Sequence, residues 1–360
     1  MTEHRDPHGG FPGGQPHRPA PPYERRDLSI RPPGLGYALP PPGLNPFVRL
    51  LRQNANVLCA CLVLVFASSF LLTNLMRFLF TLSPALHSAL QGLSPVGLGL
   101  FNMSFNTISL LVPALLAAYL LNMPYDVAFP LHRAPARLTL TGVFCCLGMS
   151  VVGVYLSAIL TTILYGTMGV SATMPDFSPP LGTTEIIMHL IAISVVPAIF
   201  EELLFRGVVM QSLRRFGDPF ALVVSSLLFA MLHRNLLQGP NAFVTGLVLG
   251  YFTLRSGSLI PAIIMHFVNN LLVGVILVVM MLMPAQQAQM LNFAVIPTYL
   301  ALGVIGILLM ISWGRGFTPM KQAATGLGEP RKYLLFFSTP LAIAFIIVTI
   351  FQTLNFLTFR

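Results

Sequence analysis

The sequence predicts an all-α fold, a polytopic bundle of transmembrane helices with about eight or nine spans. Hydrophobic residues make up 55% of the 360 residues, charged residues only 9%, and the mean hydropathy is +0.78. A soluble domain carries roughly 25% charged residues, so the composition excludes that class. The apolar residues also gather in runs about as long as a transmembrane helix, which needs about 20 residues.

Nine apolar runs follow one another along the chain. The sixth is short and rich in glycine, and we retain it because the alternation of charge described below requires it. The expected spans are residues 55–80, 96–121, 138–168, 185–212, 219–237, 240–254, 258–283, 293–313 and 334–358.

Residues 1–47 precede the first run. They are rich in proline and glycine and contain few large apolar side chains. Such a segment cannot bury enough apolar surface to offset the entropy of folding. We therefore expect a disordered tail, which the charges of the later connectors place in the cytosol.

The basic residues between the runs orient the expected helices. If the tail is cytosolic, the cytosolic connectors hold Arg133, Arg137, Arg214, Arg215, Arg255, Arg315, Lys321, Arg331 and Lys332. The opposite side then holds only Arg77, Arg234 and Arg360. Cytosolic loops of membrane proteins carry the excess of lysine and arginine. We therefore expect a multi-pass integral membrane protein with a cytosolic N-terminus and the C-terminus on the opposite side.

Charge and cysteine usage exclude other classes. The formal charge of +9 could indicate a nucleic-acid partner in a soluble protein. Here the basic residues set topology, so the expected surroundings are a lipid bilayer and no nucleic acid. The four cysteines lie inside apolar runs, which indicates buried thiols and neither a disulfide framework nor a spaced metal motif.

Two adjacent glutamates interrupt the fourth run. An ionisable residue inside a membrane helix is costly and is usually retained for function. Glu202 and Arg206 are four residues apart, so on a helix they share a face and can pair. Glu201 lies about 100° around the helix from Glu202, and its carboxylate is left available for proton transfer.

Three later polar residues fall at a comparable depth. Glu201 lies 13 residues before Arg214, and His233 lies 13 residues after Phe220, so each is roughly 20 Å from the cytosolic end of its helix. His266 lies about 16 Å up the seventh run by the same rise per residue. Asn270 is four residues beyond His266 and shares its helix face. The sequence therefore predicts a polar cavity inside the bilayer, formed by three helices.

These groups suit the addition of water to an amide. A carboxylate in a low-dielectric site can act as a general base or acid, and a neighbouring histidine can orient the water. A second histidine with an amide can donate hydrogen bonds to a developing oxyanion. No Gly-x-Ser-x-Gly nucleophile motif and no His-Glu-x-x-His zinc motif occurs in the chain.

The three motifs together resemble a known family. Glu201-Glu202-x-x-x-Arg206, Phe229-x-x-x-His233 and His266-x-x-x-Asn270 occur in that order on successive apolar runs. They resemble the CAAX protease and bacteriocin-processing (CPBP, or Abi) family, intramembrane endopeptidases related to the type II CAAX prenyl protease. The resemblance covers about residues 185–283. It implies that Glu201 activates water, that His233 helps to bind it, and that His266 and Asn270 form the oxyanion hole.

The resemblance also implies roles for the remaining groups. Glu202 and Arg206 support the site. A divalent metal is an open alternative, because Glu201, His233 and His266 could ligate zinc. We favour chemistry without a metal, because asparagine is a poor zinc ligand and the oxyanion role already uses His266 and Asn270.

The sequence thus divides into four expected segments. They are the tail of residues 1–47, N-terminal transmembrane helices over 55–168, a catalytic core over 185–283 and C-terminal transmembrane helices over 293–358. The expected function is hydrolysis of a peptide bond in a membrane-associated or lipidated protein, in a bacterial cytoplasmic (inner) membrane. The alternative is a membrane scaffold or bacteriocin-immunity protein that uses the same fold without catalysis.

Overall fold

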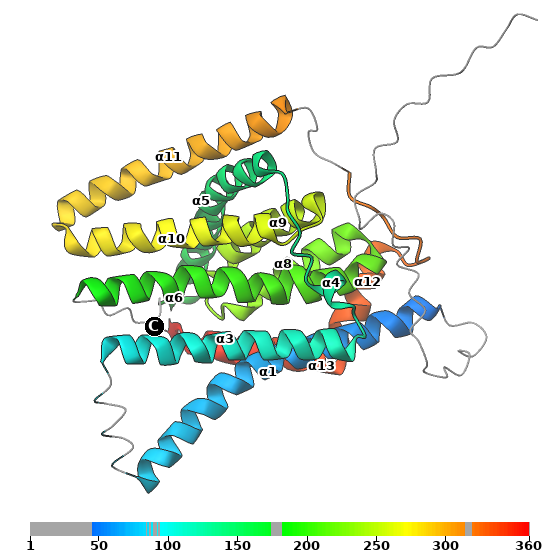
Figure 1. Ribbon diagram of the computed structural model, residues 1–360, viewed down its shortest axis with the longest axis horizontal. Coiled ribbons are helices and arrows are strands. Elements are labelled where there is room, and N and C mark those ends of the chain that lie inside the picture. Colours follow the sequence, from blue (N-terminus) through cyan, green and yellow to red (C-terminus); the bar gives the residue numbers. More distant parts are fainter. Residues whose placement is uncertain are drawn as a thin grey trace, which may run out of the picture. The chain divides into compact units, whose positions relative to one another are not determined.

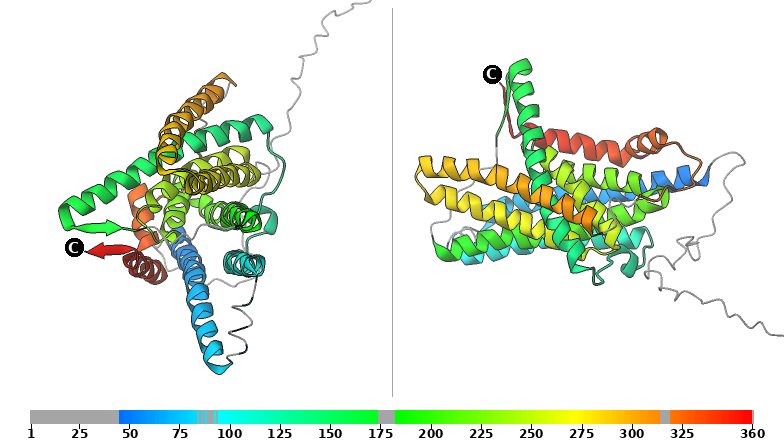
Figure 2. Two further views of the ribbon diagram at one scale, coloured as in Figure 1. Left: turned by 90° about the vertical axis from the view of Figure 1, so that its left-hand side faces the viewer. Right: turned by 90° about the horizontal axis from the view of Figure 1, so that it is seen from above.

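The computed structural model describes residues 45–83, 85, 88, 92, 94–173, 182–313 and 319–359. All of these residues belong to one compact unit, residues 37–360. They form a bundle of helices (Figure 1) with one short two-stranded sheet, drawn as two arrows in Figure 2, which confirms the expected all-α polytopic fold. The predicted tail, apart from residues 45–47, lies outside the described residues, as do Arg315 and Arg360.

The elements follow one another as a series of long helices interrupted once by irregular helical turns. In chain order they are α1 (Pro46–Leu82), α3 (Pro95–Leu120), α4 (Tyr125–Ala128), α5 (Ala136–Met168), β1 (Val170–Ala172), α6 (Thr183–Glu202), the π-helical segment η1 (Leu203–Val209), α7 (Met210–Leu213), the 3-10 turn η2 (Arg214–Phe216), α8 (Asp218–Leu232), α9 (Gly239–Ser256), α10 (Ile260–Leu282), α11 (Ala285–Ser312), α12 (Glu329–Phe337), α13 (Pro340–Leu354) and β2 (Leu357–Phe359).

Local sequence explains where the helices begin and end. Proline occupies the first or second position of α1, α3, α8, α9, α10, α12 and α13, where its fixed φ suits the helix and its missing N–H costs nothing. The Asn45 side chain accepts a hydrogen bond from the Phe47 backbone N–H at 2.9 Å and caps α1. Gly169 and Gly257 end α5 and α9 at φ values of 65° and 69°, a left-handed conformation that glycine adopts without strain.

Fewer helices qualify as membrane spans than the sequence predicted. Among the described residues, six helical stretches are long and apolar enough to cross a membrane, and α12 with α13, bent by 73°, makes a seventh if the pair counts as one span. The expected fifth and sixth runs form α8 and α9 instead. α8 has 15 residues, about 22 Å at 1.5 Å per residue, against a hydrocarbon core of about 30 Å.

The apolar character of the two short helices has another cause. α8 and α9 pack on each other and are largely buried within the bundle, so their apolar side chains face protein. Removing both from the count, as a pair, preserves the alternation of the remaining helices. The correction therefore lowers the number of spans to six, or to seven if α12 and α13 form one span. The side on which each chain end lies stays a prediction from the placement of charge.

Small residues allow α5 to cross its neighbours closely. Figure 2 shows α5 running across the direction of the other long helices. Where it meets α11, a Cβ added at Gly148 would lie 2.5 Å from the Gly303 Cα, and one added at Gly306 would lie 2.8 Å from the Cys145 backbone nitrogen. Without side chains at these points the two backbones approach closely, as in many membrane helix pairs.

The two strands join the end of α5 to the end of the chain. β1 pairs with β2 in antiparallel register, Val170 opposite Phe359 and Ala172 opposite Leu357. The Thr173 backbone N–H extends this contact by donating to the Phe356 carbonyl at 2.9 Å. The pair therefore holds the end of α13 next to the C-terminal end of α5.

The close crossing of α5 and α11 is testable by adding one methyl group. Gly148→Ala would place Cβ against the Gly303 backbone, so the helices must separate, at a cost of about 1–3 kcal/mol. We expect a lower melting temperature in detergent. Gly166→Ala in the same helix is the matched control, because its added Cβ meets nothing within 4 Å. Equal melting temperatures for the two variants would contradict this packing.

Candidate active site

The chain changes its helical geometry directly after the two glutamates. α6 ends at Glu202, and the wider π-helical turns of η1 follow. Such turns are rare and are frequent at functional sites. Side chains bond two backbone carbonyls of this segment. Gln211 Nε2 donates to the Arg206 carbonyl at 3.1 Å, and Ser225 Oγ of α8 donates to the Phe205 carbonyl at 2.7 Å. The irregular segment is thus anchored to α8.

Glu202 and Arg206 form a buried ion pair. Arg206 Nη1 lies 2.7 Å from Glu202 Oε1, and both side chains are 0% exposed. Their separation of four residues predicts this contact, and the structure contains it. A fully buried pair gains its attraction only by losing the hydration of two ions, so each charge depends on the other.

The remainder of the Arg206 guanidinium is enclosed by α8 and α9. Arg206 Nη2 donates to the Gly246 carbonyl at 3.2 Å, and the guanidinium carbon lies 4.3 Å from the centre of the Phe229 ring. A Cβ added at Gly246 would lie 3.2 Å from Arg206 Nη2 and 3.2 Å from the Ser226 Cβ. Glycine at this position therefore lets α9 approach the buried cation closely.

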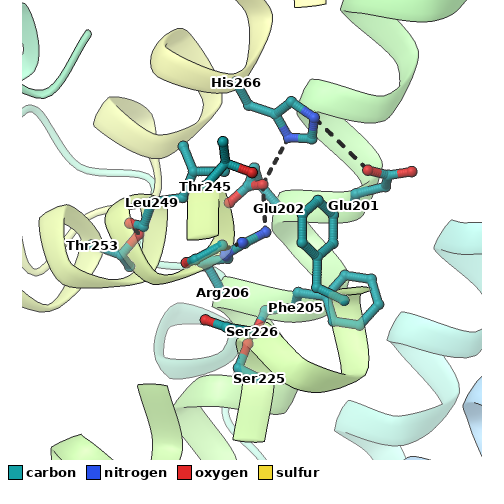
Figure 3. A network of polar contacts seen from close by, with 12 residues as sticks. Glu201, Glu202, Phe205, Arg206, Ser225, Ser226, Thr245, Leu249, Thr253 and His266 are labelled. Carbon is teal, nitrogen blue, oxygen red and sulfur yellow. Dashed lines mark hydrogen bonds and ion pairs between the residues drawn. The ribbon is translucent and has the colours of Figure 1, made fainter. Parts of the chain in front are cut away.

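His266 of α10 connects the two glutamates. Its Nδ1 lies 2.8 Å from Glu202 Oε1, and its Nε2 lies 3.8 Å from Glu201 Oε2 (Figure 3). Its side chain is 7% exposed, and that of Glu201 is 16% exposed. One oxygen of Glu202 thus contacts both Arg206 and His266, while Glu201 faces the second imidazole nitrogen.

The carboxylate of Glu202 determines which nitrogen of His266 carries a proton. A carboxylate that is paired with arginine accepts hydrogen bonds, so Nδ1 is the donor at this 2.8 Å contact. Nε2 is then a proton acceptor in the neutral ring and a donor in the imidazolium. This arrangement, a carboxylate that orients a histidine through Nδ1, is the one that holds a catalytic imidazole in place in hydrolases.

His233 lies at the C-terminal end of α8, where the helix has just ended. Its Nδ1 is 3.0 Å from the Phe229 carbonyl, which can only accept, so Nδ1 is the donor and Nε2 is free to bind water. The Phe229 ring lies between the two histidines, with ring centres 4.9 Å from His233 and 5.9 Å from His266.

A cavity of about 220 Å³ opens beside Glu201 and His233. Such a volume holds several water molecules at about 30 Å³ each. Its lining includes both polar and apolar residues, and helices outside the fourth, fifth and seventh runs contribute to it. The lining residues are Val65, Phe66, Asn106, Ser109, Leu110, Glu201, Leu232, His233, Arg234 and Gln238.

Asn270 bonds a carbonyl of α6 and does not line this cavity. Its Nδ2 donates to the Ile193 carbonyl at 3.1 Å. In a regular helix that carbonyl would accept from the backbone N–H four residues later, but Pro197 occupies that position and has none. The Asn270 amide therefore replaces the missing backbone donor and joins α10 to α6.

The neighbouring Asn269 is also buried and only partly satisfied. Its Nδ2 donates to Asn270 Oδ1 at 3.3 Å, while its Oδ1 has no partner among the described residues. Asn269 thus orients the amide of Asn270 from the other side.

The zinc alternative has little geometric support. Within the described ranges, no group of three His, Cys, Asp or Glu side chains is arranged to hold a metal ion. The imidazole Nδ1 atoms of His233 and His266 bond Phe229 and Glu202, an arrangement that leaves only the Nε2 atoms as possible ligands. The residues named from the sequence, Glu201, His233 and His266, thus do not form a three-ligand site as they stand.

Sequence reasoning did not identify the contribution of α3 to the cavity. Asn106 and Ser109 line it, and Ser109 Oγ is buried without a partner among the described residues. Pro113, four residues after Ser109 in α3, also leaves the Ser109 carbonyl without its helical donor. Asn102, Asn106 and Ser109 recur at helical spacing in an apolar run, and that polar stripe was the available signal.

Comparison with known proteins identifies the central part of the chain. Residues 183–272 match the family model described as type II CAAX prenyl endopeptidase Rce1-like. Neither the curated proteins nor the solved structures yielded a match. The matched segment contains all six residues singled out from the motifs, which confirms the resemblance to the CAAX protease family.

The structural role of Asn270 can be tested by a double-mutant cycle with Pro197. Asn270→Leu would leave the Ile193 carbonyl unsatisfied, which costs about 1–3 kcal/mol, so unfolding should shift to lower temperature. Pro197→Ala restores a backbone N–H to the same carbonyl. In that background Asn270→Leu should lower the melting temperature by clearly less. The same loss in both backgrounds would show that Asn270 does not compensate for the proline.

Proposed function

Starting from the similarity of residues 183–272 to type II CAAX prenyl endopeptidases, we propose that the protein is an intramembrane endopeptidase. It hydrolyses a peptide bond of a membrane-associated or lipidated protein with water activated by Glu201. The observation that carries the proposal is the placement of Glu201. Its carboxylate lines the cavity and lies 3.8 Å from an imidazole that a buried ion pair holds in position.

Glu201 is the general base in this mechanism. Among the described residues it is the one carboxylate in the lining of the cavity, while its neighbour Glu202 contacts Arg206 and His266. Glu201 takes a proton from the attacking water as the oxygen bonds to the scissile carbonyl carbon. It then delivers that proton to the leaving amine when the carbon–nitrogen bond breaks, which leaves a carboxylic acid and an amine as products.

His233 positions the water. Its Nδ1 is fixed by the Phe229 carbonyl, so its Nε2 accepts one hydrogen of the water while Glu201 accepts the other. Two acceptors on one water hold the oxygen lone pair toward the substrate, which is the orientation that the attack requires.

His266 and Asn270 stabilise the oxyanion. As an imidazolium, His266 carries a proton on each ring nitrogen. In that form Nδ1 donates to Glu202 and Nε2 donates to the oxyanion. Asn270 supplies its second amide hydrogen, because the first is committed to the Ile193 carbonyl.

Glu202 and Arg206 support the site without contacting the substrate. Both are completely enclosed, so they act through the ring they orient. Membrane location follows from the apolar helices. The bacterial cytoplasmic membrane, a cytosolic N-terminus and the lipidated nature of the substrate are parts of the proposal that rest on charge placement and family resemblance.

Replacing the base tests the proposal directly. Glu201→Gln keeps the size of the side chain and removes the proton acceptor, so hydrolysis should fall by about 10²–10⁴-fold. The measurement is turnover of a peptide library by the purified protein in detergent. Glu185→Gln, a change of the same kind in the first turn of the same helix, is the matched control and should retain turnover. Wild-type turnover in the Glu201 variant would refute the mechanism and favour a scaffold or immunity role.

Metal dependence gives a second test. Because the described residues do not provide three converging ligands, hydrolysis should be unchanged after incubation with a strong chelator and dialysis. The comparison is turnover before chelation, after chelation and after addition of zinc. A loss that zinc restores would instead assign Glu201, His233 and His266 to a metal site.

A further inference from the structure

Arg234, next to His233, is held in an unusual backbone conformation. Its φ is 54°, a left-handed value that costs a residue with a side chain about 1 kcal/mol or more and that persists where surrounding structure enforces it. The adjacent Asn235 fixes the loop, because its Nδ2 donates to the Thr173 carbonyl at 2.8 Å and its Oδ1 accepts from the Leu237 N–H at 2.8 Å. Arg234 is thereby placed in the wall of the cavity that contains Glu201 and His233.

The guanidinium of Arg234 is only partly satisfied. Its Nη1 donates to Gln352 Oε1 of α13 at 2.8 Å, and its central carbon lies 5.4 Å from the centre of the Phe66 ring of α1. Its Nε is buried without a partner among the described residues, and its Nη2 donates no hydrogen bond to any of them. No carboxylate of a described residue lies within ion-pair distance of the Arg234 guanidinium.

The unused donors have a specific geometry. Nε and Nη2 form one edge of the planar guanidinium, and their N–H bonds are parallel, which is the arrangement that receives both oxygens of a carboxylate. Gln352 and Phe66, on two different helices, hold the opposite side of the group. A buried donor that lacks an acceptor destabilises the protein, so the site is built for an acceptor that the described residues do not supply.

We propose that Arg234 is a specificity-determining residue that binds a carboxylate of the peptide substrate. This inference rests on the proposed function and deepens it. Glu201 and Arg234 line the same cavity without pairing with each other. The negative group of a bound peptide is attracted to Arg234 and repelled by Glu201, so the carboxylate lies at Arg234 and an uncharged amide lies at Glu201. The cavity thus aligns the peptide as well as selecting it.

Two sources provide the same chemistry, an α-carboxylate at the end of the peptide and a Glu or Asp side chain. Four short apolar peptides with a neutral fluorophore separate them. The first pair has no acidic residue and ends in either a carboxylate or an amide. The second pair ends in an amide and contains either one internal glutamate or one glutamine. Binding to the full chain carrying Glu201→Gln is measured in detergent by fluorescence anisotropy, so that cleavage does not interfere.

We expect the charged member of one pair to bind at least about tenfold more tightly than its neutral partner, as hydrogen bonds to a charged group allow. Adding Arg234→Gln should abolish this preference. Arg234→Lys should retain only part of it, because a lysine ammonium does not present the two parallel N–H donors of a guanidinium. Arg234→Gly removes the cation and suits a φ of 54°, so it should fold and also lose the preference. Arg137→Gln, which removes an arginine stacked 5.7 Å from the centre of the Trp313 ring, is the matched control and should keep it.

The outcomes separate this inference from the mechanism. A carboxylate preference that survives Arg234→Gln and Arg234→Gly, or its absence from both peptide pairs, would overturn the role of Arg234. Neither result bears on catalysis, because binding is measured without turnover. Conversely, hydrolysis that is unaffected by Glu201→Gln would remove the proposed mechanism and leave the binding preference as a separate observation.

Discussion

The site depends on one interaction, the ion pair between Glu202 and Arg206. Both side chains are 0% exposed and their atoms are 2.7 Å apart, so neither charge has water as an alternative partner. Removing one member of such a pair leaves an uncompensated buried ion and typically costs 3–5 kcal/mol. The neighbouring helices are arranged around this requirement. α9 supplies the Gly246 carbonyl, α8 the Phe229 ring and α10 the His266 imidazole.

The pair also explains why two adjacent glutamates have different environments. The Glu202 side chain is fully buried and its Oε1 contacts both Arg206 and His266, whereas Glu201 is 16% exposed and lines the cavity. His266 connects them, because the nitrogen that Glu202 does not occupy is directed at Glu201. The buried carboxylate of Glu202 therefore orients the His266 ring, which lies beside Glu201, the proposed catalytic carboxylate. The π-helical turns that begin after Glu202 belong to the same arrangement, since they anchor the segment carrying Arg206 to α8.

Much of this could be predicted from the sequence, where short-range spacing decides the contact. The separation of four residues predicted the pairing of Glu202 with Arg206. Counting residues along two helices led us to expect Glu201 and His233 close together, and both line one cavity. Interactions that depend on packing could not be predicted. The contact of Asn270 with the Ile193 carbonyl requires knowing which helix lies against α10, and the contributions of Ser109 and Arg234 require knowing where α3 and α13 pack. The sequence predicted a membrane span at α8, because a helix buried in protein and a helix buried in lipid are both rich in apolar residues.

The most direct test of the central claim compares the stability of two variants of the adjacent glutamates. Glu202→Gln and Glu201→Gln make the same chemical change one residue apart, and thermal unfolding of both is measured in one detergent. If the buried pair holds the site together, Glu202→Gln leaves the buried Arg206 cation without its counter-charge and destabilises the protein by several kcal/mol. Glu201→Gln, which removes a charge at the cavity wall, should change stability by less than about 1 kcal/mol. Equal losses, or a larger loss for Glu201→Gln, would contradict the account.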